Sequence, residues 1–324
     1  MVKSLNSIKT PIDEEIKEFH HRFKSAMKSD VPLLDKVTNF IIKRKGKQMR
    51  PMFIFLSAKI CGEVNELTYH AANLVELLHT ATLIHDDVVD DSMQRRGFFS
   101  LKALWGNKIA VLVGDYLLSK GLLLSIENNA INLLKITSDA VKEMSEGELL
   151  QIEKARRLDI EESVYFKIIR KKTASLIASA CASGAASATD DPQTIQKMHL
   201  FGEKIGIAFQ IRDDLFDFGD GNAGKPQGND IQEKKMTLPL IHALNNTDKA
   251  KRNYIINIIK NENTDPQKIK EVTQFVLNSN GIEYARNMMY QYRDEAFEIL
   301  RSFPLSASRT SLEDLVNYVT ERNK

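Results

Sequence analysis

The sequence is poor in proline, glycine and cysteine. Its 324 residues contain 8 prolines and 15 glycines, and so few helix breakers favour long uninterrupted helices over a turn-rich β fold. The two cysteines, Cys61 and Cys181, lie far apart and have neither a metal-binding nor a redox spacing. We therefore expect both to be buried thiols of a protein in a reducing compartment.

The sequence also shows little net charge and no recognisable targeting segment. A net charge of +2 provides no broad electrostatic attraction to nucleic acid, so we expect no nucleic-acid partner. Residues 1–6 lack the apolar core of a signal peptide, and no stretch has the length and apolarity expected of a membrane span. These features predict a cytoplasmic protein without an integral membrane segment.

Helix signals recur along the chain. Pro11, Pro192 and Pro266 each follow a polar residue that can cap a helix N-terminus. Apolar residues recur at spacings of three and four, whereas no alternating strand pattern and no internal repeat is recognisable. We predict an all-α fold with one domain over residues 1–324, including long helices over residues 64–92 and 191–218.

Each of these two long helices ends in a cluster of aspartates. Asp86 and Asp90 lie four residues apart on one helix face, and Asp213 and Asp217 repeat this spacing with Asp214 beside them. The carboxylates need a counter-ion, because like charges at this spacing repel and the apolar residues around both clusters indicate burial. Oxygen ligands without His or Cys suit Mg²⁺, which completes its shell with phosphate oxygens and water. The alternative is a pair of solvated acidic patches.

Basic residues and a glycine-rich segment accompany the clusters. A bound diphosphate would also need cationic side chains, although each candidate taken singly is more often a surface charge. These candidates are Lys47, Arg50, Arg95, Arg96, Lys171, Lys172, Lys225 and Lys235. Residues 219–229 hold four of the 15 glycines, which indicates either a mobile flap over the site or a plain connector.

The two acidic clusters and the basic segments together resemble a known family. Residues 86–90, followed by Arg-Arg-Gly at 95–97, resemble the first aspartate-rich motif of the trans-polyprenyl diphosphate synthases, and residues 209–217 resemble the second. Residues 46–51 resemble the family's basic motif for isopentenyl diphosphate, and residues 76–79 its neighbouring histidine. Further matches are residues 114–116, 172–173, 235–239 and 312–318. Two aspartate motifs in order, with basic elements between and around them, are highly specific.

The resemblance implies a bundle of long helices around a deep central cavity, usually a homodimer. It implies an enzyme that condenses isopentenyl diphosphate head-to-tail onto an allylic diphosphate, with three Mg²⁺ ions on the allylic diphosphate. The implied metal ligands are Asp86, Asp87, Asp90, Asp213, Asp214 and Asp217. The implied partners of the allylic diphosphate are Arg95, Lys172, Gln210, Lys225 and Lys235, and Thr173 is implied to bind substrate. The implied partners of isopentenyl diphosphate are Lys47, Arg50, His79 and Arg96. The chain departs from the family at Lys45 and Lys234, which each replace a frequent glycine.

The helix before the first motif carries the residues expected to set product length. Ala81 lies five residues before Asp86, with Thr82 next to it, and we expect Ala81 to point into the cavity below the metals. The alternative is that Ala81 only permits close helix packing. Leu78 should follow roughly one turn deeper, about 5.4 Å along the axis. The family's short-chain members have an aromatic residue at or next to this position. Because both residues are small here, we predict a medium- to long-chain, octaprenyl-type product.

Other functions account for fewer residues. Glu76 with His79, and Glu18 with His21, have the Glu-x-x-His spacing of di-iron bundles, but this function leaves the six aspartates without a role. Residues 217–219 spell a kinase metal motif without its companion motifs. A terpene cyclase or head-to-head synthase would not need the second diphosphate site that the basic motif indicates. A non-catalytic subunit is disfavoured because both aspartate motifs are complete, and a short-chain farnesyl or geranylgeranyl diphosphate synthase remains an alternative.

Overall fold

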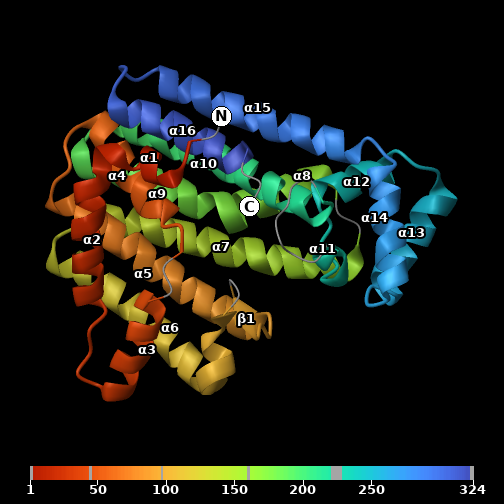
Figure 1. Ribbon diagram of the computed structural model, residues 1–324, viewed down its shortest axis with the longest axis horizontal. Coiled ribbons are helices and arrows are strands. Elements are labelled where there is room, and N and C mark those ends of the chain that lie inside the picture. Colours follow the sequence, from red (N-terminus) through yellow and green to blue (C-terminus); the bar gives the residue numbers. More distant parts are fainter. Residues whose placement is uncertain (1–2, 44–45, 96–97, 159–160, 220–227, 322–324) are drawn as a thin grey trace.

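In the part of the chain that is described, the protein is a bundle of α-helices with one small hairpin of two short strands (Figure 1). The computed structural model describes residues 3–43, 46–95, 98–158, 161–219 and 228–321. The elements up to the hairpin are α1 (Leu5–Ile8), the 3₁₀ helix η1 (Thr10–Ile12), α2 (Asp13–Ala26), α3 (Pro32–Lys43), α4 (Met49–Cys61), α5 (Glu66–Val89), β1 (Gln94–Arg95) and β2 (Phe98–Phe99). The next are α6 (Leu101–Glu127), α7 (Ile131–Arg157), α8 (Glu162–Ile169), the π-helical turn η2 (Arg170–Ala174), α9 (Ser175–Ala188) and α10 (Pro192–Asp217). The last are α11 (Asn229–Gln232), α12 (Leu238–Asn245), α13 (Lys249–Asn261), α14 (Pro266–Leu277), α15 (Gly281–Arg301) and α16 (Ala307–Glu321). The all-α prediction is confirmed.

The two long helices predicted to carry the aspartates are α5 and α10. The Asn65 side chain caps α5 by accepting hydrogen bonds from the N–H groups of Leu67 and Thr68, at 2.9 and 3.3 Å. Asp191 caps α10, and Pro192 occupies its first turn, as the sequence predicted. Pro11 is different, because it lies in the 3₁₀ helix η1 rather than at the start of an α-helix.

Helix α9 lies at the centre of the bundle and packs against α4, α5, α7 and α10. Almost all of its residues are buried, and most are Ala, Ser or Gly. Small residues let neighbouring backbones come close. A Cβ atom on Gly184 would lie 2.3 Å from the carbonyl oxygen of Ile54 in α4, and one on Gly202 of α10 would lie 2.6 Å from the Cα of Ala178. These approaches hold α10, and therefore the second aspartate cluster, against the core.

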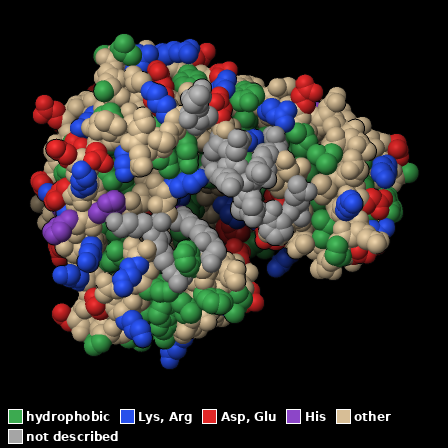
Figure 2. Space-filling model, in the orientation of Figure 1, with side chains coloured by type: hydrophobic (Ala, Val, Ile, Leu, Met, Phe, Trp, Pro, Cys, Tyr) green, Lys and Arg blue, Asp and Glu red, His purple; other side chains and the backbone are tan. Residues whose placement is uncertain are grey.

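Helix α6 corrects the expectation that no stretch resembles a membrane span. By length and composition Leu101–Glu127 is apolar enough to cross a membrane, with a mean hydropathy of 1.7 over 18 residues, of which 33% are buried. One face packs against α5, where Gly114 and Gly121 allow close contact with His85 and Leu74. The opposite face exposes large apolar residues, namely Leu104, Val111, Leu112, Leu122, Leu123 and Ile126. In Figure 2 hydrophobic side chains gather over this part of the molecule.

Both cysteines are free thiols. Cys181 is buried in α9, and Cys61 at the end of α4 is partly buried. Burial raises the pKa of the Cys61 thiol to about 12 and raises that of Cys181 as well. Neither thiol is therefore a ready nucleophile near neutral pH. The expectation of a buried thiol holds for Cys181, whereas Cys61 is only partly buried.

Candidate active site

The two aspartate clusters line one continuous cleft. Its largest part, a cavity of about 1180 Å³, is lined by Asp86 at the end of α5 and by Asp213 at the end of α10. A smaller cavity of about 270 Å³ shares Asp213 with it and adds Asp214 and Asp217. A third, of about 760 Å³, contains Asp90 and adjoins both of the others. In Figure 2 acidic and basic side chains are visible in the hollow at the centre of the molecule.

The cleft is charged at its mouth and apolar further in. The apolar residues of the largest cavity come from several helices and include Phe53, Met144, Leu176, Ile177, Phe209 and Phe216. Asp87, the remaining aspartate of the first motif, is buried with 4% of its surface exposed and does not line the cavities described here. The cleft thus joins a set of carboxylates to a wall that is mostly apolar.

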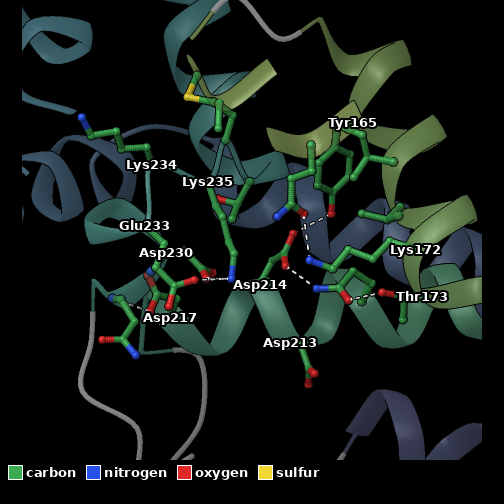
Figure 3. A pocket seen from close by; sticks show the side chains of 18 residues that line it. Tyr165, Lys172, Thr173, Asp213, Asp214, Asp217, Asp230, Glu233, Lys234 and Lys235 are labelled. Carbon is green, nitrogen blue, oxygen red and sulfur yellow. Dashed lines mark hydrogen bonds and ion pairs between the residues drawn. The ribbon is translucent and has the colours of Figure 1, made fainter. Parts of the chain in front are cut away.

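Asp214 is held by two side chains (Figure 3). The Tyr165 hydroxyl donates a hydrogen bond of 2.7 Å to its Oδ2 atom, and Gln210 Nε2 donates one of 2.8 Å to its Oδ1 atom. The Gln210 carbonyl oxygen in turn accepts a hydrogen bond of 2.7 Å from the Thr173 hydroxyl. Asp213 projects from α10 in a different direction from Asp214. The two adjacent aspartates therefore have different surroundings.

Asp217 holds the chain that follows the glycine-rich segment. Its Oδ1 atom accepts a hydrogen bond of 2.9 Å from the N–H of Asn229, and its Oδ2 atom accepts one of 3.2 Å from the N–H of Asp230. Asp217 is 7% exposed. Its carboxylate therefore satisfies backbone donors at the start of α11, a use that the predicted metal role did not foresee.

Burial disfavours the charged form of two of the carboxylates. Burial raises the pKa of Asp214 to about 8, the nearby charges of Asp230 and Asp213 add to this rise, and the hydrogen bonds from Tyr165 and Gln210 oppose it. Burial also raises the pKa of Asp90, against the charges of Lys172 and Lys235. Such groups gain most from a cation placed beside them.

The carboxylates are spread along the cleft rather than gathered in one cage. Within the described ranges, no three Asp, Glu, His or Cys side chains converge as a ready-made metal site. This arrangement fits Mg²⁺, which is usually held by one or two carboxylates together with substrate phosphates and water rather than by an all-protein cage. The donor set of carboxylate oxygens is likewise the one Mg²⁺ prefers.

Two predicted cations face the carboxylates and are paired with acids outside the aspartate motifs. Lys172 pairs with Glu148 of α7, and Lys235 pairs with Glu233 and lies 3.9 Å from Asp230. Although burial alone would lower it, the charges of Asp230 and Glu233 raise the pKa of Lys235. Both lysines are therefore paired with acidic side chains in the structure. The candidate cation Lys171 instead pairs with Glu146, at 2.5 Å, and does not line these cavities.

A π-helical turn directs Lys172 and Thr173 into the cleft. Both side chains belong to η2 and line the two cavities that contain Asp213. Gly147 of α7 makes room for this turn, because a Cβ atom there would lie 2.7 Å from the backbone nitrogen of Lys172. Single π-helical turns inside α-helices occur frequently at functional sites.

The residues predicted to bind isopentenyl diphosphate also lie together. Lys47, Arg50 and His79 line the largest cavity along with Asp86. Lys47 Nζ lies 5.3 Å from the centre of the Tyr318 ring in α16, a cation–π distance. The structure therefore brings the basic motif to the same cleft as both aspartate clusters.

Some predicted residues lie outside the described part of the chain. These are Lys45, Arg96 and Lys225, and most of the glycine-rich segment lies there too; the side chain of Arg95, in β1, is not described either. Lys234 can be placed. It adopts a left-handed conformation with φ 56°, where glycine is the usual residue, and its Nζ donates a hydrogen bond of 2.7 Å to the carbonyl oxygen of Lys260.

The expectation for Ala81 is wrong. Ala81 is fully buried in a core cluster between α5 and α6, with Leu77, Val113 and Leu117, and it does not line the cavity. Each residue turns an α-helix by about 100°, so a side chain five positions before Asp86 points well away from it. A side chain four positions before Asp86 points in nearly the same direction as Asp86, and Thr82, at that position, does line the cavity. Leu78 is buried in the main core and also lies outside the lining.

Four polar residues of the cleft were missed by sequence reasoning. They are Glu148, Tyr165, Asp230 and Glu233, which pair with the predicted lysines and aspartates. Asp230 and Glu233 stand within five residues of Lys235, and that proximity was the available signal. Glu148 and Tyr165 lie on α7 and α8 with no local motif that marks them.

Comparison with known proteins agrees with this geometry. The model of the family described as "Polyprenyl synthetase" matches residues 31–276. The all-trans-nonaprenyl-diphosphate synthase (geranyl-diphosphate specific) of Rhodobacter capsulatus is 35% identical over 97% of each chain. The octaprenyl diphosphate synthase of Escherichia coli is 33% identical over 92% of this chain and 93% of its own.

Solved structures with this fold come from proteins with long and short products. The decaprenyl diphosphate synthase from Rhodobacter capsulatus has a TM-score of 0.94 at 33% identity and covers 99% of this chain and 100% of its own. A polyprenyl synthase from Caulobacter crescentus, complexed with calcium and isoprenyl diphosphate, has a TM-score of 0.92 at 30% identity, with 100% and 99% covered. A geranylgeranyl pyrophosphate synthase from Bacteroides thetaiotaomicron has a TM-score of 0.83 at 39% identity, with 98% of each chain covered. With both aspartate clusters in one cleft and a family model that spans most of the sequence, the chain belongs to the polyprenyl synthetase family.

Proposed function

We propose that this protein is a prenyltransferase that condenses isopentenyl diphosphate head-to-tail onto an allylic diphosphate to form a trans-polyprenyl diphosphate. The observation that carries the proposal is the single cleft in which two aspartate clusters face basic residues and continue into an apolar cavity. The geometry suits ionisation of a diphosphate ester at the charged mouth and growth of a hydrocarbon in the apolar part.

Mg²⁺ is the proposed cofactor. Asp86, Asp90 and Asp213 line the cleft and are placed to hold the ions, three by family resemblance, together with diphosphate oxygens. Bound Mg²⁺ would neutralise the charge that develops on the departing diphosphate. The Caulobacter neighbour was solved with calcium and isoprenyl diphosphate, which supports a divalent cation in this fold. Asp214 and Asp217 line the smaller cavity of the same cleft and would complete the set of carboxylates, whereas Asp87 is buried and would act from behind them.

The remaining site residues bind and orient the two substrates. Lys172, Thr173, Gln210 and Lys235 surround the aspartates of the second cluster, so we assign them to the allylic diphosphate. Lys47, Arg50 and His79 line the adjoining cavity and are assigned to isopentenyl diphosphate. The allylic cation forms in the apolar cavity, where the isopentenyl double bond attacks it. The proton then lost passes to the released diphosphate, and no protein nucleophile is needed.

A product of medium to long chain is the proposed outcome. Thr82 is a small residue on the wall of a cavity of about 1180 Å³, and the relatives include nonaprenyl and octaprenyl diphosphate synthases. The Bacteroides neighbour is named a geranylgeranyl synthase, so the short-chain alternative has a specific observation in its favour. Labelled isopentenyl diphosphate supplied with farnesyl or geranylgeranyl diphosphate and Mg²⁺ tests both. Products longer than those of geranylgeranyl synthases support the proposal, and products that stop at farnesyl or geranylgeranyl length refute it.

A cytoplasmic homodimer is the proposed state of the protein. The exposed apolar face of α6 is a contact surface that a second copy of the chain would cover, and two free thiols agree with a reducing compartment. Light scattering of the purified protein tests the dimer. The double variant Leu112→Glu/Leu123→Glu should be monomeric, and a wild-type protein that is itself monomeric would refute the assignment.

A further inference from the structure

A chain of four side chains crosses the second aspartate cluster. Tyr165 of α8 donates a hydrogen bond to Asp214 of α10, Gln210 of α10 donates to the same carboxylate, and Thr173 of η2 donates to Gln210. The links run in this order in Figure 3. All four side chains line the cavity of about 270 Å³. Of these four hydrogen-bonded residues, only Tyr165 belongs neither to an aspartate motif nor to the proposed substrate contacts.

The geometry of Tyr165 is tightly restrained. The side chain is 4% exposed, and its ring packs edge-on against Phe166 with 5.3 Å between ring centres. Because the ring is fixed, the hydroxyl reaches Oδ2 of Asp214 from one direction only. With Oδ1 occupied by Gln210, both oxygens of Asp214 accept a hydrogen bond from protein, so the carboxylate plane is set by its neighbours.

The same chain sets the amide of Gln210. An amide has one carbonyl face and one NH₂ face. Here the NH₂ group faces Asp214 and the carbonyl faces the Thr173 hydroxyl. If Asp214 lost its fixed orientation, the Gln210 amide could rotate and exchange the positions of its carbonyl oxygen and its NH₂ group. Thr173, the neighbour of Lys172, would then lose a fixed acceptor.

We propose that Tyr165 is a positioning residue for the condensation reaction, whose hydroxyl orients Asp214 and, through Gln210, the Thr173 hydroxyl beside Lys172. The proposal rests on the function proposed above. Side chains that orient metal-site carboxylates commonly change metal affinity or activity by about 10–100-fold when they are removed. Tyr165 therefore affects the Mg²⁺ dependence of the reaction rather than the binding of isopentenyl diphosphate.

The test compares Tyr165→Phe with Tyr284→Phe. The second variant is a matched control, because the Tyr284 hydroxyl donates a 2.5 Å hydrogen bond to Glu162 on the same helix α8 but away from the cleft. We expect Tyr165→Phe to raise the Mg²⁺ concentration for half-maximal rate by about tenfold and to lower kcat by about tenfold. KM for isopentenyl diphosphate should not change. Tyr284→Phe should match wild type in all three quantities, and circular dichroism would show that both variants fold.

Tyr165→Phe in an Asp214→Asn background shows whether Tyr165 acts through Asp214. The effect of Tyr165→Phe should disappear there, because the oriented carboxylate is gone. An equal effect in both backgrounds, or a folded Tyr165→Phe enzyme with the wild-type Mg²⁺ dependence, would overturn the proposal. If Tyr165→Phe does not fold, Thr173→Val removes the hydroxyl at the other end of the chain, and an unshifted Mg²⁺ dependence in that variant also overturns it. A wild-type enzyme without Mg²⁺-dependent condensation would instead be a failure of the proposed function.

Discussion

Replacing Thr82 by phenylalanine should shorten the product. Thr82 is partly buried, lines the cavity of about 1180 Å³ and lies four residues before Asp86. At 1.5 Å per residue it stands about 6 Å along α5 from Asp86. An aromatic ring there would fill the apolar space that the product enters after its first few condensations. The aspartates of the cleft would keep their positions, because the ring occupies the next turn of the helix.

The assay is product size from labelled isopentenyl diphosphate, measured beside the rate of the first condensation. We expect Thr82→Phe to retain first-step activity within about tenfold and to release shorter products. Thr82→Val is the matched control, because it removes the hydroxyl that donates to the carbonyl oxygen of His79 without adding bulk, and its products should keep wild-type length. A folded, active Thr82→Phe enzyme with products of wild-type length would show that this wall does not limit the chain.

The neighbouring position should behave differently. Ala81 is fully buried between α5 and α6, and adding bulk to a packed core commonly costs about 1–3 kcal/mol. Ala81→Phe should therefore lower the free energy of unfolding by at least that amount in chemical denaturation. Wild-type stability in this variant would mean that Ala81 faces open space, as the sequence alone had suggested.

Four further predictions follow from other parts of the structure. Asp213→Asn should lower turnover by about a hundredfold, the scale for losing one strong electrostatic stabiliser, and a folded variant with near-wild-type turnover would exclude a role in ion binding. Arg50→Ala should raise KM for isopentenyl diphosphate far more than KM for the primer, and Lys235→Ala should do the reverse; equal changes in both constants would contradict the division of the cleft. Hydrogen bonds from Thr194 and Gln193 lower the pKa of Asp191 below the ordinary range of an aspartate, so its capping contribution is present above that range and is lost as the pH falls through the lowered pKa. Asp191→Ala should accordingly melt a few degrees lower than wild type at neutral pH in calorimetry, with the difference vanishing in strong acid. Lys234→Ala should destabilise the protein more than Lys234→Gly in thermal unfolding, because both lose the bond to Lys260 but only glycine relieves the left-handed backbone.

The sequence predicts well what depends on neighbours along the chain. Capping by Asp191 and the aspartate spacing in α10 are local, so the helix and its acidic end were predictable. The meeting of α5 and α10 at one cleft came from family resemblance, since no local pattern specifies which helix ends adjoin. The side of α5 on which Ala81 lies was predictable from helix geometry, because the fourth residue before Asp86 shares its direction and the fifth does not.

Other features depend on contacts that no motif marks. The π-helical turn at Thr173 needs the close approach of Gly147 from another helix, and the pairing of Lys172 with Glu148 joins α7 to that turn. Asp217 satisfies backbone donors at the start of α11, although its spacing is that of a metal ligand. In each case tertiary packing selected one of several uses that the residue type allows.

The two lysine–glutamate pairs in the cleft have a consequence for which anions can enter. Since Lys172 is paired with Glu148 and Lys235 with Glu233, an entering anion meets lysines whose charge a carboxylate already balances. A singly charged ester interacts with a lysine about as favourably as the glutamate does, so exchanging one for the other adds almost no binding free energy. A diphosphate that arrives with divalent cations can replace both partners at once while the cations attract the freed acids. We therefore expect the two pairs to favour a metal-bound diphosphate over a singly charged ester.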